Sequence, residues 1–242
     1  MTPVGIQLYT LRRPFAENPL ATLERIREIG YDAVEFAAPL TMDFAAFGAR
    51  MQEIGLDCPS AHVGLADLAE RPDAVLAMAK ALGCRYLVMP YVEPQARDWA
   101  AVATKLMAFA PRARAEGLRL AYHHHDFEFE TADGLHPFEF LLAETDPDLI
   151  HFELDVYWLK KAGEDPQAMI ERLKDRVRLV HLKDMAADGG MTDVGSGTLN
   201  FQALIAAAEA AGVEHFFVEH DFPPKPYWPS VEASLGYLRT LS

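Results

Sequence analysis

Short runs of apolar and β-branched residues alternate along the chain with longer amphipathic segments. Each short run has the character of a strand, and a segment with apolar residues at helical spacing follows it. Eight such units predict a parallel sheet closed on itself, an α/β fold of the (β/α)8 barrel type with helices around the strands. The expected strands are Val4–Tyr9, Ala33–Phe36, Cys58–His62, Tyr86–Met89, Leu118–His123, Ile150–Asp155, Val177–His181 and His215–Glu219.

Glycines mark the ends of several predicted helices, because the left-handed residue that often ends a helix is usually Gly. These glycines are Gly30, Gly55, Gly83, Gly117 and Gly212. The pattern runs from end to end without a linker, which predicts one barrel domain over residues 1–242. The longest predicted loop, Ala186–Thr198, follows the seventh strand, where barrels commonly carry functional loops.

Composition narrows the partners of such a protein. Half of the 242 residues are apolar, and the formal net charge is −14. Nucleic-acid binding relies on clustered Lys and Arg, so we expect no nucleic-acid partner. The sequence shows no apolar run of transmembrane length and no basic segment ahead of an apolar one at its start, so we expect a cytoplasmic protein without a membrane partner. Cys58 and Cys84 lack metal-type spacing and are expected to stay reduced.

Polar residues sort to one face of the predicted strands. The outer face of a barrel strand packs against helices, so polar side chains should point inward or lie at the strand ends. Counting back by twos from the ends gives the inward set Gln7, Glu35, Ser60, His62, His123, Asp155, His181 and Glu219. The outward neighbours are Val34, Phe36, Leu120, Phe152, Leu154, Val180, Phe216 and Val218. This division predicts a polar site at the C-terminal mouth of the barrel.

Four adjacent strands each end in a residue that can bind a metal: His123, Asp155, His181 and Glu219. Nitrogen and carboxylate donors without thiolate suit Mn²⁺, Zn²⁺, Mg²⁺, Co²⁺ or Fe²⁺. We therefore expect one divalent metal ion, with Mn²⁺ the first to test. The alternative is that these strand ends hydrogen-bond to one another without a metal. His124 should point away from His123, because successive side chains alternate along a strand.

Several segments, in this order, resemble the xylose isomerase-like barrel superfamily, also called the sugar phosphate isomerase/epimerase family, over essentially the whole chain. They are Val34-Glu35-Phe36, Ser60-Ala61-His62, Glu153-Leu154-Asp155, His181-Leu182-Lys183-Asp184, Gly195-Ser196-Gly197-Thr198-Leu199-Asn200-Phe201 and Val218-Glu219-His220-Asp221. The resemblance implies that Asp155, His181 and Glu219 occupy three of the family's four metal-ligand positions. It also implies that Glu35 and His62 face the substrate.

Two departures from the family pattern change the expected chemistry. The fourth ligand position is usually a Glu, but here it holds His123, which resembles a subset that includes inosose dehydratase-like and keto-sugar enzymes. Epimerisation by two glutamates is thereby disfavoured relative to elimination next to a carbonyl or a one-base isomerisation. Multi-zinc endonuclease relatives carry an Asp-x-x-His segment, whereas this chain has Trp158 after Asp155, so a DNA-repair site looks incomplete.

These residues suggest an isomerase or epimerase that abstracts a proton next to the carbonyl of a sugar, keto-sugar or cyclitol. A metal that chelates the carbonyl and a neighbouring hydroxyl would make the adjacent C–H acidic. Glu219 is the candidate base, His123 a ligand or acid–base partner, and Lys183 a candidate for enolate stabilisation. A dehydratase or lyase is the alternative, a barrel that binds metal and sugar without turnover is a second, and a DNA endonuclease is the least favoured.

Five residues are expected to contact a small sugar or cyclitol substrate: Glu35, His62, Tyr91, Glu128 and Tyr157. The tyrosines offer ring faces at the mouth, and Glu128 follows the histidines of strand five. Lys183 has a structural alternative, a pair with Asp184 or another acid. The sequence leaves the phosphorylation state of the substrate open. It also leaves the oligomeric state open, although the stiff loop Pro223–Pro229 is a candidate lid or contact within a homo-oligomer.

Overall fold

Eight parallel strands close into a barrel in the computed structural model, which describes residues 3–37, 39–131 and 134–241. In chain order the strands are β1 (Val4–Gln7), β2 (Ala33–Phe36), β3 (Asp57–His62), β4 (Tyr86–Met89), β5 (Arg119–His123), β6 (Ile150–Asp155), β7 (Val177–Leu182) and β10 (His215–Val218). Their order around the barrel is β1-β10-β7-β6-β5-β4-β3-β2, and β2 pairs with β1. Closure satisfies the backbone hydrogen bonds of every strand edge. The predicted (β/α)8 barrel is confirmed.

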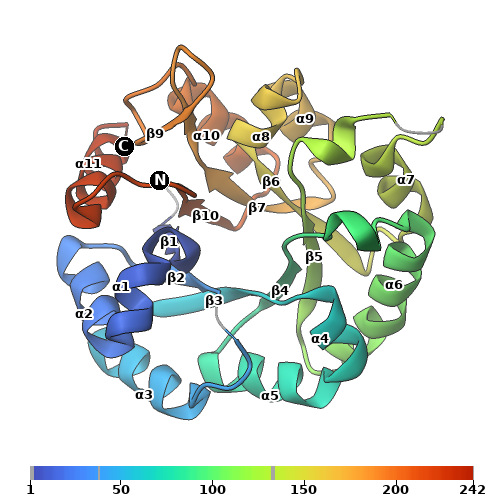
Figure 1. Cartoon of the computed structure of the whole chain (residues 1–242), viewed down its shortest axis with the longest axis horizontal. Helices are drawn as coiled ribbons and strands as arrows, with labels where there is room; N and C mark the ends of the chain where they lie inside the picture. Colours follow the sequence, from blue (N-terminus) through green and yellow to red (C-terminus); the bar gives the residue numbers. More distant parts are fainter. Residues whose placement is uncertain (1–2, 38, 132–133, 242) are drawn as a thin grey trace.

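Helices form an outer ring around the strands (Figure 1). They are α1 (Arg12–Glu17), α2 (Pro19–Ile29), α3 (Phe44–Ile54), α4 (Leu65–Glu70), α5 (Pro72–Leu82), α6 (Trp99–Ala115), α7 (Pro137–Glu144), α8 (Val156–Lys161), α9 (Pro166–Arg172), α10 (Phe201–Ala210) and α11 (Tyr227–Arg239). Short 3-10 turns lie at η1 (Leu8–Leu11), η2 (Pro94–Ala96) and η3 (Phe127–Phe129). Gly30, Gly55 and Gly83 take positive φ at the ends of α2, α3 and α5, as predicted.

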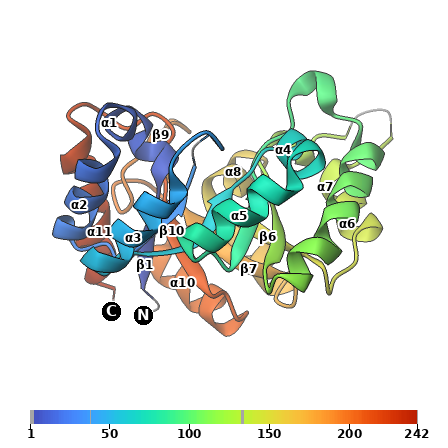
Figure 2. The same cartoon turned by 90° about the horizontal axis from the view of Figure 1, so that it is seen from below.

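Contacts between α2 and α11 close the helical ring where the chain begins and ends. Arg25 of α2 forms a 2.6 Å ion pair with Glu232 of α11. The Tyr31 hydroxyl, just after α2, donates a 2.8 Å hydrogen bond to the Val231 carbonyl of α11. Figure 2 shows both termini on the lower side of the molecule, whereas α1, α4 and β9 lie on the upper side. The segments that follow the strands therefore gather at the face opposite to the termini.

The interior of the barrel is polar near the C-terminal ends of the strands and apolar in the layer before them. Six inward side chains form an apolar cluster within the strands: Ala33, Tyr86, Val88, Ala121, Leu179 and Phe217. The next inward residue along several of these strands is polar, as in Glu35 after Ala33 and His181 after Leu179. Outward residues such as Val34 and Leu154 are buried between strands and helices. The polar side chains therefore lie on a close-packed floor at the C-terminal mouth.

The end of the first strand and the loop after the seventh strand differ most from the prediction. The first strand was predicted to reach Tyr9, but it ends at Gln7, whose side-chain oxygen accepts a 2.9 Å hydrogen bond from the Tyr9 N–H and starts η1. The predicted loop Ala186–Thr198 contains half of a short antiparallel ribbon, in which β8 (Asp184–Met185) pairs with β9 (Met191–Thr192). Among the described helices, none combines the length and apolarity needed to cross a membrane.

Candidate functional site

The four side chains predicted as metal ligands meet at the C-terminal ends of β5, β6, β7 and β10. One donor atom from each of His123, Asp155, His181 and Glu219 lies within 4.8 Å of the others. Strand pairing causes part of this convergence, since Asp155 and His181 are partners in the β6–β7 register. All four residues are buried. The two imidazoles and two carboxylates therefore face one small volume.

Asp155 uses its two carboxylate oxygens for different purposes. Its Oδ1 accepts hydrogen bonds from the Tyr157 and Trp158 N–H groups, at 2.9 and 3.0 Å, and so caps the N-terminus of α8. Its Oδ2 is buried without a well-directed hydrogen bond, although Lys183 Nζ lies 3.1 Å away. Burial raises the pKa of Asp155 to about 6 against the opposing charge of Lys183. The second carboxylate oxygen, Oδ2, therefore keeps a lone pair that can bind a cation inside the site.

His123 also presents an unused lone pair or proton. Its Nδ1 is buried without a hydrogen bond, and Glu153 Oε2 lies 3.5 Å from it. Burial and the adjacent positive charge of His181 lower the pKa of His123 well below its ordinary value, so this imidazole is neutral at pH 7. His124 turns to the other side of the strand, as predicted, and its Nε2 accepts a 3.2 Å hydrogen bond from the Asp155 N–H. Of the three consecutive histidines that begin at the end of β5, His123 is thus the one that joins the cluster.

His181 contacts carboxylates on two sides of its ring, one side through each ring nitrogen. Its Nδ1 lies 2.8 Å from Glu219 Oε2. On the other side, its Nε2 lies 2.7 Å from Glu35 Oε2 and 3.1 Å from Glu153 Oε2. Burial opposes protonation, but the surrounding carboxylates outweigh it and raise the pKa of His181 well above its ordinary value. The ring orientation is therefore fixed by partners on both sides.

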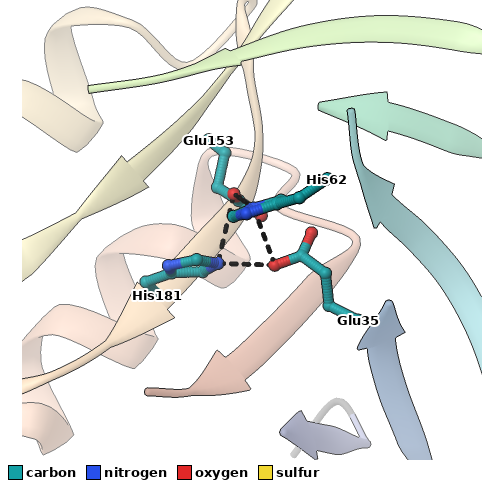
Figure 3. Close-up of side chains that lie close together, drawn as sticks. All are labelled: Glu35, His62, Glu153 and His181. Carbon is teal, nitrogen blue, oxygen red and sulfur yellow. Dashed lines mark hydrogen bonds and ion pairs between the residues drawn. The ribbon is translucent and has the colours of Figure 1, made fainter. Parts of the chain in front are cut away.

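His181 also belongs to a second group of side chains, in which Glu35, Glu153 and His181 are buried and His62 is partly buried (Figure 3). His62 Nε2 lies 3.1 Å from Glu35 Oε2 and 2.9 Å from Glu153 Oε2. Burial opposes its protonation, but these carboxylates raise the pKa of His62 to about 9. Glu35 further accepts hydrogen bonds from the side chains of Gln7, at 2.6 Å, and Ser60. The predicted inward polar residues thus support one another under the mouth.

Glu153 was not among the residues selected from the sequence. It is fully buried, opposite His123 in the β5–β6 register, and it contacts His62 and His181. The signal was present, because Glu153 stands two residues before Asp155 and therefore has the same inward parity. Only the last residue of β6 was considered as a site residue. A charged residue two positions before a candidate ligand on the same strand is the sequence signal that identifies such a residue.

Lys183, the predicted candidate for enolate stabilisation, is buried among three carboxylates. Its Nζ lies 2.9 Å from Glu219 Oε2, 3.0 Å from Asp221 Oδ1 and 3.1 Å from Asp155 Oδ2. Burial opposes its charge, but Asp155 and the other acids raise the pKa of Lys183 well above its ordinary value. The sequence suggested a pair with Asp184 or another acid as the alternative role, and the structure pairs Lys183 with acids other than Asp184. The Lys183 ammonium instead lies at the edge of the candidate metal cluster.

Asp184 holds the loop that follows β7. Its Oδ2 accepts hydrogen bonds from the N–H groups of Gly195, at 3.0 Å, and Gly197, at 2.8 Å, and its Oδ1 accepts one from the Leu199 N–H, at 3.2 Å. A Cβ at Gly197 would lie 2.4 Å from Asp184 Oδ1, which explains the glycine. The Gly-Ser-Gly segment is therefore folded around a carboxylate of the chain itself.

A cavity of about 530 Å³ opens above the cluster. Its described lining consists of Tyr9, Ala37, His62, Pro90, Tyr91, Glu93, His123, His125, Lys183, Glu219, Asp221 and Phe222. Two of the five predicted substrate contacts, His62 and Tyr91, are on this surface. The volume falls in the range of about 300–1,000 Å³ that is usual for small-molecule sites. A sugar-sized molecule can therefore reach His123, Lys183 and Glu219.

The other three predicted substrate contacts lie behind the cavity wall. Glu35 is fully buried and contacts His62 and His181. Glu128 is also fully buried, and its oxygens accept hydrogen bonds from the Tyr122 hydroxyl, at 2.6 Å, and the His125 N–H, at 2.8 Å.

Tyr157 donates a 3.1 Å hydrogen bond to the Gly189 carbonyl in the turn between β8 and β9. The structure thus gives Glu35, Glu128 and Tyr157 partners within the protein and places none of them on the described cavity lining.

Comparison with known sequences identifies the family. The sequence model described as "xylose isomerase-like TIM barrel" matches residues 23–241. An inosose dehydratase from Geobacillus kaustophilus is 26% identical over 193 residues, which are 69% of this chain and 62% of that protein. The chain spans about half to three fifths of the length of the curated relatives it matches first.

Comparison with solved structures shows the same fold over nearly the full chain. A sugar phosphate isomerase/epimerase from Parabacteroides distasonis has a TM-score of 0.85 at 24% identity, covering 98% of this chain and 93% of that one. A 3-keto-D-glucoside 4-epimerase from E. coli has a TM-score of 0.76 at 20% identity, covering 99% and 100%. At these identities the likeness shows the fold alone. Together with the match over residues 23–241, it shows that the chain belongs to the xylose isomerase-like TIM-barrel family.

Proposed function

We propose that this protein is a divalent-metal-dependent enzyme that removes a proton next to the carbonyl of a sugar, keto-sugar or cyclitol. The main support is that one donor atom from each of His123, Asp155, His181 and Glu219 lies within 4.8 Å of the others beneath an open cavity. Within this cluster, His123 Nδ1 and Asp155 Oδ2 are buried without a hydrogen bond. A buried polar atom without a partner costs about 1–3 kcal/mol, and a bound cation would remove this cost.

The donor set fits a divalent cation. Five carboxylates converge at or just below the mouth, from Glu35, Glu153, Asp155, Glu219 and Asp221. The basic groups in contact with them are Lys183 and three imidazoles, His62, His123 and His181. Nitrogen and oxygen donors suit Mn²⁺, our first choice, and also Zn²⁺, Mg²⁺, Co²⁺ or Fe²⁺. We propose His123, Asp155, His181 and Glu219 as ligands of an ion that would polarise the substrate carbonyl.

The side chains on the cavity wall supply the remaining chemistry. Glu219 is both a proposed ligand and the carboxylate placed to take the proton from the substrate carbon. Lys183, held against Glu219 Oε2 at 2.9 Å, is placed to stabilise an oxygen on which negative charge develops. His62 and Tyr91 contact substrate hydroxyls and ring carbons. Glu35 acts through His62 and His181, whose orientation it fixes.

Dehydration is the second candidate reaction on the same residues. With His123 in place of a second glutamate, the cluster has a single glutamate, Glu219, beside Asp155 and two imidazoles. This arrangement suits removal of a proton by Glu219, and because His123 is neutral, protonation of a leaving hydroxyl is assigned to Lys183 on the cavity lining. The similarity to inosose dehydratases also supports it. Isomerisation and dehydration share the first step, so the metal site is tested first and the outcome of the reaction second.

Metal content of two ligand variants tests the proposal. Asp155→Asn retains an oxygen that can cap α8, so it changes the ligand while keeping the fold. We expect about one metal ion per chain in the wild type and at least a tenfold lower content in Asp155→Asn and His181→Ala, measured by mass spectrometry of the elements. Asp148→Ala, an exposed acid at the opposite end of β6, is the matched control. Full occupancy in both ligand variants would refute the assignment.

Reaction type is distinguished by assays in deuterated water. The substrates are ketoses, inosose-like ketones and 3-keto-glycosides, each incubated with the metal-loaded protein. Solvent deuterium in a recovered isomeric sugar indicates an isomerase or epimerase, whereas a new enone absorption indicates a dehydratase or lyase. Metal binding and ligand-dependent melting without turnover of any substrate would point to a binding protein and contradict the proposed enzyme.

A further inference from the structure

Exposed aromatic side chains gather at the mouth of the cavity. In the described part of the chain, four large hydrophobic residues are exposed: Tyr9 (46%), Leu20 (42%), Tyr91 (39%) and Phe222 (76%). The three aromatic ones all line the cavity, although they come from separate loops after β1, β4 and β10. Scattered exposed hydrophobic residues need no explanation, but a group of them around one opening marks a recognition surface.

Two of the three rings are held in place. The Tyr91 ring meets those of His125 and Phe127 edge-on, with centroids 5.1 and 5.5 Å away. The guanidinium of Arg12 lies 4.2 Å from the centre of the Tyr9 ring, and its Nη2 donates a 2.7 Å hydrogen bond to the Asp221 carbonyl. Arg12 therefore connects Tyr9 to the loop after β10. These two rings are preorganised on different sides of the opening.

Phe222 is different, because its ring is mostly in solvent. Its backbone is anchored, since the Phe222 N–H donates a 3.2 Å hydrogen bond to His220 Nδ1. Among the described residues, no ring or cation contact involves its side chain. When a ligand covers an exposed phenyl ring on a fixed backbone next to a cavity, removal of the ring from water favours binding.

The charge of the lining limits the ligand. Three of the residues around the cavity are acidic, Glu93, Glu219 and Asp221. Lys183 is the one lysine on the described lining, which contains no arginine, and its ammonium is already paired with three carboxylates. The guanidiniums beside the outer rings, those of Arg12 and Arg97, lie over aromatic rings and donate hydrogen bonds to backbone carbonyls. The acidic side chains of the lining therefore disfavour a phosphate or carboxylate on the outer part of the ligand. The surface suits an uncharged ligand.

We propose that the cavity has two subsites and that the substrate is an uncharged glycoside. The reacting sugar lies on the polar floor, at His62, His123 and Glu219, and the ring attached to it lies among Tyr9, Tyr91 and Phe222. Sugar and aryl rings both present an apolar face that packs on aromatic side chains. This inference rests on the proposed function, because it assigns the floor to the reacting sugar.

Binding of paired sugars and glycosides to the Mn²⁺-loaded protein tests the outer subsite. The probes are D-glucose, D-galactose and D-mannose, their methyl and phenyl glycosides in both anomeric forms, and the disaccharides cellobiose, lactose and maltose, measured by calorimetry. We expect at least one phenyl glycoside or disaccharide to bind about tenfold more tightly than its parent sugar and methyl glycoside. A gain for disaccharides identifies a sugar in the outer subsite, and a gain for phenyl glycosides alone identifies an aryl group.

Substitutions test which residues cause the gain in glycoside affinity. Phe222→Ala and Tyr9→Ala should each reduce it at least threefold, whereas Leu20→Ala, which removes an exposed hydrophobic residue away from the cavity, should leave it unchanged. The inference is overturned if no glycoside of the panel outbinds its parent sugar, or if the gain survives both aromatic substitutions. Either result leaves the proposed metal-dependent reaction standing when Asp155→Asn loses its metal. Normal metal content in Asp155→Asn refutes the proposed function instead.

Discussion

At the scale of single residues, Glu128 has a consequence for pH dependence. Burial raises its pKa from 4.5 to about 7, although hydrogen bonds from Tyr122 and His125 oppose the shift. Between these two values the folded protein holds a proton that the unfolded chain has lost. The free energy of unfolding must therefore decrease as pH rises from about 4.5 to about 7, and the contribution is fully present only below this window.

The variant Glu128→Gln removes this titration while keeping the size of the side chain. We expect it to lose a pH-dependent contribution of about 3 kcal/mol between pH 4.5 and pH 7. Urea unfolding at a series of pH values measures the effect. Glu130→Gln, an exposed glutamate two residues later, is the control and should behave as the wild type does. An unchanged pH profile in Glu128→Gln would show that the buried carboxyl does not titrate in this window.

Lys183 is the second residue with a measurable effect, because its charge balances three buried acids. Lys183→Met leaves Asp155, Glu219 and Asp221 without their shared ammonium. Breaking a buried ion pair on one side typically costs about 3–5 kcal/mol, so the metal-free variant should melt well below the wild type.

Added Mn²⁺ should recover more stability in Lys183→Met than in the wild type, because the cation replaces the lost charge next to the same carboxylates. Thermal melting with and without metal measures both effects. Lys160→Met, a substitution of an exposed lysine on α8, provides the comparison and should change neither value. A metal-free Lys183→Met protein as stable as the wild type would contradict the role given to the ammonium.

At the scale of elements, the loop after β7 depends on one carboxylate. Asp184 accepts hydrogen bonds from the N–H groups of Gly195, Gly197 and Leu199. Asp184→Ala removes all of these acceptors, and we expect a loss of about 3 kcal/mol in the free energy of unfolding. The amides of residues 195–199 should exchange hydrogen faster in Asp184→Ala than in the wild type, while those of β7 should be unchanged.

Hydrogen exchange followed by mass spectrometry checks this expectation. Asp188→Ala, in the turn of the β8–β9 ribbon, removes an exposed acid that bonds only locally to the Gly190 N–H, and it serves as the matched control. Equal exchange rates for residues 195–199 in both variants would mean that the loop is held by contacts other than those of Asp184.

At the scale of the whole molecule, periodicity was sufficient for the barrel and for the direction of most polar side chains. The strands that were expected from apolar runs are present, with ends shifted by at most two residues. Parity along the strands brought His123, Asp155, His181 and Glu219 to one mouth, since alternation is a property of the extended backbone itself. Closure of the sheet then follows from eight similar units.

The side-chain positions that the sequence did not predict depend on loop conformation and on how deep a residue lies within the barrel. The positions of Glu128 and Tyr157 behind the cavity wall are set by their hydrogen bonds to Tyr122 and Gly189, which no local pattern reveals. The exposure of Phe222 likewise depends on how the loop after β10 leaves the barrel. Glu153 was missed for another reason, because depth along a ligand-bearing strand was not considered.

The cap that Asp155 places on α8 has a consequence for binding kinetics and affinity. Two backbone N–H groups hold one oxygen of this carboxylate, so the remaining oxygen is already oriented before any ion arrives. The Asp155 side chain therefore loses its rotamer freedom on folding and not on metal binding. Because this entropy cost does not oppose metal binding, more of the coordination energy contributes to affinity. An arriving cation meets a ligand that does not have to search for its conformation, and slow release rather than slow capture is the expected signature of such a site.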